Sequence, residues 1–176
     1  MTYWPFEIET LKTVSQALEI AEDRTGDFYK YSLVQWKRHR YDVKTQCQLT
    51  EEELVAPAFA LLHKYTGSTL TDPPKARLRD FYFICLQDHQ ILKALKRDNK
   101  LQLLPLLIYV FTHELVHIVR FCNFSERFEI IGEGRDREEG IVHSTTYDIL
   151  KNVDLPDMDY ILDAYQGHRI CDLALS

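Results

Sequence analysis

One short segment carries residues that can hold a metal ion and activate water. His113, Glu114 and His117 stand in the order His-Glu-x-x-His. On a helix, residues four apart lie one turn apart on the same face, so both imidazoles can reach one cation. Zinc accepts imidazole nitrogen and, in catalytic sites, keeps one position for water. Glu114, one position round the helix, can take a proton from that water. The segment therefore predicts a zinc centre.

A catalytic zinc centre needs a third protein ligand, which we expect downstream of the motif. Glu139 is the best candidate, because it lies 22 positions beyond His117, far enough for a connector and a returning helix. Glu138 and His143 are the alternatives. Adjacent helical positions point about 100° apart, so only one of Glu138 and Glu139 can face the metal. Further carboxylates in this stretch are Glu126, Glu129 and Glu133.

Two residues after Glu139 are candidates for a catalytic role. His143 lies four residues on, hence on the same helix face, and has four possible roles. It can orient a ligand, replace Glu139 as ligand, donate to the oxyanion of the reaction, or be a solvated surface residue. Tyr147, one turn further, is either an oxyanion donor or a packing residue. Tyr165 and His168 are weaker oxyanion candidates.

The elements that must hold these residues follow from apolar periodicity. From Lys100 to about Cys122, large apolar residues recur at three- and four-residue steps, which predicts a long buried helix with Pro105 in its first turn. Its longest apolar run has ten residues, too short for a membrane span, which needs about 20. A polar connector and a second helix, from 138 to 151, follow.

The rest of the chain mixes helical and strand patterns. We predict a helix over residues 6–22 that ends at Thr25-Gly26-Asp27, and a helix that begins at Thr50, with Glu53 completing a capping box, and ends near Gly67. Strands are predicted at 28–36, 41–49 and 79–86, and short helices at 91–97 and 160–165. This order is typical of an α+β fold.

The two motifs together resemble the gluzincin metallopeptidases. In that family, the helix with His-Glu-x-x-His is followed by a second helix whose Glu completes the site, often with Gly directly after it. The resemblance covers roughly residues 100–151, under a third of the chain. The matching residues are His113, Glu114 and His117, then Glu139-Gly140-Ile141-Val142.

This resemblance implies zinc as cofactor, with His113, His117 and Glu139 as ligands and Glu114 as general base. It implies one compact zincin-like domain over residues 1–176, with a small mixed sheet, an active-site helix and a second ligand-bearing helix. In such a fold the edge strand of the sheet lines the cleft and pairs with an extended peptide substrate. Residues 79–86 are the candidate edge strand.

Composition limits the partners. The 176 residues carry a net charge of −6, which argues against a dedicated nucleic-acid binder. The basic segment 36–41 is accordingly interpreted as a solvated strand end or hairpin. The chain begins without a secretory signal pattern, and its four cysteines never form CxxC, as expected for a cytoplasmic protein with reduced thiols.

The leading hypothesis is a zinc-dependent peptidase that acts on a peptide or protein substrate, with no nucleic acid and no membrane as partner. The second hypothesis is a non-catalytic zinc-binding or peptide-binding regulatory module. The third is a metal-free helical interaction domain in which the motif occurs by chance.

Overall fold

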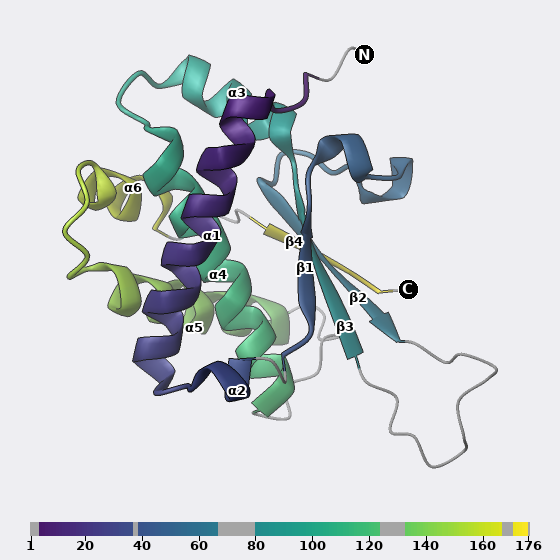
Figure 1. Ribbon diagram of the computed structural model, residues 1–176, viewed down its shortest axis with the longest axis vertical. Helices are drawn as coiled ribbons and strands as arrows, with labels where there is room; N and C mark the ends of the chain where they lie inside the picture. The colour runs from purple at the N-terminus through teal and green to yellow at the C-terminus, as the bar shows by residue number, and fades with distance from the viewer. Residues whose placement is uncertain (1–3, 37–38, 67–79, 124–132, 167–170, 176) are drawn as a thin grey trace.

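In the computed structural model, a layer of helices covers one side of a four-stranded sheet (Figure 1). The structure describes residues 4–36, 39–66, 80–123, 133–166 and 171–175. The elements in these ranges are α1 (Ile8–Tyr29), α2 (Leu33–Trp36), β1 (Tyr41–Lys44), the 3-10 turns η1 (Gln46–Gln48) and η2 (Glu51–Glu53), β2 (Ala60–Thr66), β3 (Asp80–Leu86), α3 (Asp88–Arg97), α4 (Leu103–Asn123), α5 (Glu133–Leu150), α6 (Met158–Tyr165) and β4 (Cys171–Leu175). The predicted α+β class with a small mixed sheet is confirmed at this level.

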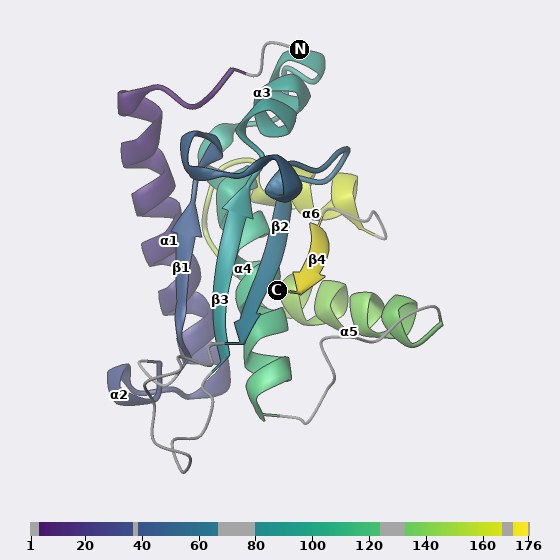
Figure 2. The same cartoon turned by 90° about the vertical axis from the view of Figure 1, so that its right-hand side faces the viewer.

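The sheet has the strand order β1-β3-β2-β4. β2 and β3 are antiparallel, whereas β1 pairs with β3 and β4 pairs with β2 in parallel. Figure 2 shows α1 and α4 behind the strands, on the face that the core occupies. Alternate residues of β3, namely Tyr82, Ile84 and Leu86, are buried there together with Leu62 of β2, as the two-residue period of a strand requires.

α4 is the central helix of the core. It is buried throughout residues 105–119 and contacts α1, α5, α6 and β3. Pro105 lies in the first turn, where its missing N–H leaves no intrahelical hydrogen bond unmade. In length and composition alone α4 is apolar enough to cross a membrane, but most of it is buried inside the protein, which is the behaviour of a core helix.

The strand predicted at 28–36 is wrong, because this segment is helical. α1 continues past Gly26 to Tyr29, and α2 follows after a short turn. Gly26 does not end α1. It makes room for the indole of Trp36, whose Nε1 would lie 2.5 Å from a Cβ at that position. α1 ends instead at Lys30, which adopts a left-handed conformation with φ of 59°.

The helix predicted after Thr50 is also wrong. The Thr50 N–H donates to Glu53 Oε2 at 3.0 Å, as in a capping box, but a single 3-10 turn and then β2 follow. Pro57 falls inside the predicted helix, where it would remove a backbone hydrogen bond and clash with the preceding turn. The strand predicted at 41–49 is shorter than expected, since β1 ends at Lys44 and η1 follows.

The other predicted elements are confirmed. The strand at 79–86 is β3, and the helices at 91–97, 100–122, 138–151 and 160–165 are α3, α4, α5 and α6. The edge position predicted for the strand at 79–86 is wrong, because β3 pairs with β1 on one side and with β2 on the other. Within the described sheet the edge strands are β1 and β4, and β4 was not predicted.

Candidate metal centre

The His-Glu-x-x-His residues lie in the most deeply buried part of α4. The side chains of His113, Glu114 and His117 expose no surface. The two imidazole rings lie one turn apart, with centroids separated by 4.9 Å and planes inclined at 68°. The helix therefore turns both rings toward the same side, as the four-residue spacing predicts.

α5 brings a carboxylate to these two rings. Glu139 Oε2 lies 3.3 Å from Nε2 of His113, and Glu139 Oε1 lies 3.0 Å from Nε2 of His117. Each carboxylate oxygen thus faces one imidazole. The two packed helices α4 and α5 thus bring these three side chains to one small space.

These distances are short, but the groups do not meet with hydrogen-bonding geometry. Both ring nitrogens of His113 and His117 and both carboxylate oxygens of Glu139 are buried without a hydrogen-bond partner among the described residues. Buried polar groups are normally hydrogen-bonded, and an unsatisfied one costs about 1–3 kcal/mol. A set of converging nitrogens and oxygens with no other partner fits a cation that binds them all, and zinc takes this donor set.

The ionisation states also suit a metal. Burial lowers the pKa of His113 to about 4, although Glu139 acts in the opposite direction. Burial raises the pKa of Glu139, but the combined effect of the adjacent His113 and His117 is larger and lowers it. The pKa of Glu139 therefore lies well below its usual value. At neutral pH the pair is a neutral imidazole and an ionised carboxylate, which are the forms that bind metals.

Glu138, the neighbouring candidate ligand, faces a different group. Its carboxylate forms a bidentate ion pair with Arg120 of α4, with Nε–Oε1 at 2.6 Å and Nη2–Oε2 at 2.9 Å. Both side chains are largely buried. The pair joins α5 to α4 one residue before Glu139. The structure therefore brings Glu139, and not Glu138, to the two imidazoles.

His143 lies one turn after Glu139 and close to the same groups. One of its ring nitrogens is within 4.8 Å of a ligand atom of His113 and of Glu139. Its ring centroid lies 4.8 Å from that of His113, and the Tyr109 hydroxyl oxygen lies 3.1 Å from His143 Nδ1. This position is compatible with all three functional roles predicted for His143, as ligand, orienting group or oxyanion donor.

Sequence reasoning missed Tyr109. It precedes His113 by four residues, so Tyr109, His113, His117 and Phe121 form one stripe along α4. Phe121 stacks on the imidazole of His117, with ring centroids 5.5 Å apart and planes at 18°. The four-residue spacing, extended one turn in each direction from the motif, was the signal that could have found both rings.

Tyr147 is 44% exposed and lines, with Tyr109 and His143, a cavity of about 290 Å³ between α4, α5 and α6. Tyr165 packs edge-on against Phe59, with ring centroids 5.4 Å apart, and its ring centroid lies 6.3 Å from that of Tyr109. The remaining candidates lie outside the part of the chain that the structure describes: His168, Glu126, Glu129 and the side chain of Glu133.

A second group of potential ligands lies on the face of the sheet opposite α4. Glu53 Oε1 accepts hydrogen bonds from Lys44 Nζ at 2.9 Å and from the Tyr65 hydroxyl at 3.2 Å, and lies 2.9 Å from His63 Nδ1. The Cys85 thiol is near, and burial together with the charge of Glu53 raises its pKa to about 12. Because an ammonium already neutralises Glu53, we interpret this group as an ion-pair network that holds η2 on the sheet.

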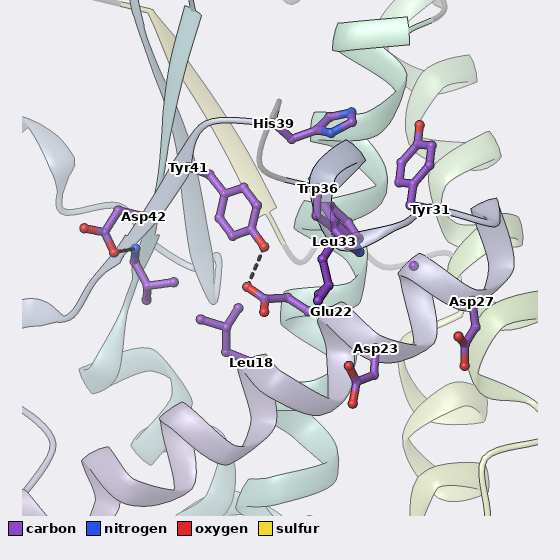
Figure 3. Close-up of a pocket in the computed structure, with 12 residues that line it drawn as sticks. Leu18, Glu22, Asp23, Asp27, Tyr31, Leu33, Trp36, His39, Tyr41 and Asp42 are labelled. Carbon is purple, nitrogen blue, oxygen red and sulfur yellow. Dashed lines mark hydrogen bonds between the residues drawn. The ribbon is translucent and has the colours of Figure 1, made fainter.

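A cavity of about 540 Å³ lies away from both groups, between α1, α2 and β1 (Figure 3). Glu22 lines it and accepts a hydrogen bond from the Tyr41 hydroxyl at 2.5 Å. Trp36 and Tyr41, from the basic segment of the sequence, also line it, whereas Lys37 and Arg38 lie outside the described residues. The motif residues do not line this larger cavity, so it is separate from the candidate metal centre.

Comparison of the chain with models of protein families, with curated proteins and with solved structures found no match. The candidate metal centre therefore depends on the motif residues and on their geometry.

Proposed function

We propose that the chain is a zinc-dependent peptidase whose metal is held by His113, His117 and Glu139. The observation that carries this proposal is the convergence of two buried imidazoles and one ionised carboxylate on a common space without hydrogen bonds among them. Two imidazoles and a carboxylate leave one position of a tetrahedral zinc site for water or substrate. The resemblance of the two motifs to the gluzincins agrees with this donor set.

Bound there, zinc would polarise the scissile carbonyl and lower the pKa of a water molecule toward about 7. Glu114, next to His113 on the fully buried face of α4, accepts one proton from the attacking water. The oxygen of the water forms a bond to the carbonyl carbon. Glu114 then delivers the proton to the leaving amine nitrogen as the C–N bond breaks. The carboxylate is regenerated, and one water is consumed for each bond cleaved.

The developing negative charge on the carbonyl oxygen needs a donor from the protein. We assign this role to His143, because it is the partly exposed imidazole beside the proposed ligands and contacts Tyr109. Tyr147 is the alternative donor, since it lines the cavity that begins at His143. The choice is testable, because His143→Gln should lower the turnover number more than Tyr147→Phe does.

An extended substrate requires a strand edge beside the centre, and we assign this role to β4 in place of β3. Two observations support the assignment. β4 pairs with β2 on one side and is an edge of the described sheet. Arg135, in the first turns of α5, forms an ion pair with Asp172 of β4 at 3.1 Å, which links the strand to the helix that carries Glu139.

One observation favours the second candidate function, a non-catalytic zinc site. His113, Glu114 and His117 expose no surface, and closed sites are typical of structural zinc. Of the five residues around the centre, Glu139 and His143 are the ones that are partly exposed, although the two carboxylate oxygens of Glu139 are themselves buried.

Glu114→Gln separates the two functions. In the peptidase, the variant keeps about one zinc per chain but loses hydrolysis by several orders of magnitude, because the amide cannot accept the proton. The measurement is elemental analysis together with digestion of a peptide library, with wild type as reference. Zinc near one per chain without cleavage by wild type would favour the non-catalytic site. Cleavage by the variant at the wild-type rate would remove Glu114 from the mechanism.

A further inference from the structure

The cavity of about 540 Å³ between α1, α2 and β1 has a wall of two kinds of side chain, aromatic rings and carboxylates (Figure 3). Its volume is within the range of about 300–1,000 Å³ that is usual for small-molecule sites. The rings are those of Tyr31, Trp36, His39 and Tyr41, and the carboxylates are those of Glu22, Asp23, Asp27 and Asp42. The proposed hydrolysis uses none of these residues.

Trp36 is the centre of the aromatic part of the wall. Its indole meets three other rings edge-on, with centroids 5.6 Å from Tyr31, 5.6 Å from His39 and 6.2 Å from Tyr41. Gly26 of α1 makes room for this arrangement, because the indole Nε1 would lie 2.5 Å from a Cβ at that position. The aromatic wall is therefore held in place by its own packing and by the close approach of α1.

The carboxylates of the wall are not neutralised by a cation. Among the residues that the structure describes, no Lys or Arg lines the cavity, and none of the four carboxylates forms an ion pair. Glu22 is the least exposed of the four, and Figure 3 shows its carboxylate directed at the Tyr41 hydroxyl, which donates to Oε1 at 2.5 Å. Burial and the neighbouring Asp23 and Glu19 raise the pKa of Glu22, although the hydrogen bond from Tyr41 lowers it. A cation bound beside Glu22 would stabilise its ionised form.

His39 supplies a neutral ring to the wall. Burial lowers the pKa of His39 below its ordinary value, although the hydrogen bond to the Gln35 carbonyl oxygen, at 3.1 Å from Nδ1, acts in the opposite direction. At neutral pH the imidazole is therefore uncharged. The described part of the wall thus combines aromatic surface with negative charge.

We propose that this cavity binds a quaternary ammonium group, carried either by a small molecule or by a trimethylated lysine side chain. The faces of aromatic rings attract cations, and Trp does so most strongly. A quaternary ammonium has no N–H to satisfy and presents methyl groups to the rings, so it loses little on leaving water. The inference is independent of the proposed function, because the motif residues do not line this cavity.

The arrangement of the carboxylates favours this group over other cations. A metal ion or a primary ammonium needs several oxygens that converge on it. Asp23, Asp27 and Asp42 are exposed, and one oxygen of Glu22 already accepts the Tyr41 hydrogen bond. The carboxylates therefore act on a bound cation mainly through their charge, while the rings supply the contact surface.

The test uses the full chain with Trp4→Phe, which leaves Trp36 as the only tryptophan and makes its fluorescence a reporter of the cavity. Trp4 is 70% exposed and lies outside the cavity, so its replacement should be harmless. The probes are choline and 3,3-dimethylbutan-1-ol, its neutral analogue in which carbon replaces nitrogen. The two have the same shape, so the ratio of their affinities reports the charge. Choline is expected to bind about tenfold or more tightly than the alcohol.

Glu22→Gln removes the least exposed charge but keeps an oxygen for the Tyr41 hydrogen bond. It is expected to lower the affinity for choline about three- to tenfold and to change that for the alcohol by less than about twofold. Asp27→Asn is the second variant, since it changes an exposed residue and should lower the choline affinity by a smaller factor without disturbing the fold. Glu52→Gln is the matched control, because it makes the same change at an exposed position of η2 outside the cavity and should keep the wild-type ratio.

A short peptide with one trimethyllysine, compared with the same peptide carrying lysine, distinguishes the two sources of the group. Tighter binding of the methylated peptide than of choline would identify a protein side chain as the ligand, and the reverse order would identify a small molecule. Equal affinity for choline and the alcohol, no saturable binding of choline, or a wild-type ratio in Glu22→Gln would overturn the inference.

Discussion

Replacing Glu139 by glutamine should remove most of the stabilisation that zinc gives to the folded chain. Glu139 supplies one oxygen to each of the two buried imidazoles, at 3.3 and 3.0 Å. Glutamine has the same shape, but it has no negative charge, and its NH2 group would face one of the two rings. The variant should therefore fold with a similar core and bind zinc much more weakly.

The magnitude follows from linkage. At free zinc of 100 times the dissociation constant, wild type gains about 2.7 kcal/mol. For a chain of 176 residues, 1 kcal/mol corresponds to about 2–4 °C in Tm, so zinc should raise Tm by about 5–11 °C. Mutation of a residue that hydrogen-bonds a metal ligand typically weakens metal affinity about 10–100-fold. Loss of the ligand itself should therefore weaken zinc affinity by at least about 100-fold. At the same free zinc, the variant then gains about 0.4 kcal/mol, or about 1–2 °C.

The assay is calorimetric unfolding of chelator-treated protein at buffered free zinc, with and without the metal. Glu138→Gln is the control, because it makes the same chemical change one residue earlier and breaks the pair with Arg120 instead. The control should have a lower Tm in both conditions but keep the zinc-dependent increment. An equal increment in Glu139→Gln and wild type, or none in wild type, would refute the assignment of the ligand.

Three further outcomes are expected. Glu138→Ala should destabilise the fold by about 3–5 kcal/mol in urea denaturation, because the Arg120 charge is left largely buried; a loss under about 1 kcal/mol would contradict this. Gly140→Ala should raise the unfolding free energy by about 0.5–1 kcal/mol, and a decrease would show that its Cβ is not accommodated. Burial raises the pKa of Glu53, but the hydrogen bond from Lys44 and other contacts lower it to about 2. The contribution of the Glu53 carboxylate to the unfolding free energy should therefore be complete above about pH 4.5 and be lost as pH falls toward 2. Glu53→Gln should flatten that part of the pH profile of unfolding free energy, and an unchanged profile would exclude Glu53 as its source.

The helices that carry the candidate centre were predictable from local pattern. The apolar residues of α4 recur at helical spacing over more than five turns, so no competing structure fits the segment. The same periodicity that identifies the buried face also puts His113 and His117 on it. Glu139 was found because a third ligand was required and a returning helix was available. Its choice over Glu138 agreed with the family resemblance, since helical angle alone allows either.

The segments predicted wrongly are those in which tertiary contacts decide the structure. Tyr29, Tyr31 and Trp36 have high strand propensity, but their rings pack on one another at the end of α1, and no strand of the described sheet pairs with them. Leu61 and Leu62 continued a helical pattern, yet Pro57 separates them from the turn at Thr50. β4 was not predicted, and its partner β2 lies about 110 residues earlier in the chain.

That long separation has a consequence for synthesis. A ribosome that has completed β2 must still translate α3, α4, α5 and α6 before β4 emerges. Throughout that interval one side of β2 has unpaired amides and carbonyls, which another nascent chain can engage. The described sheet is therefore still one strand short, with an unpaired edge that favours aggregation, when α4 and α5 have already been made.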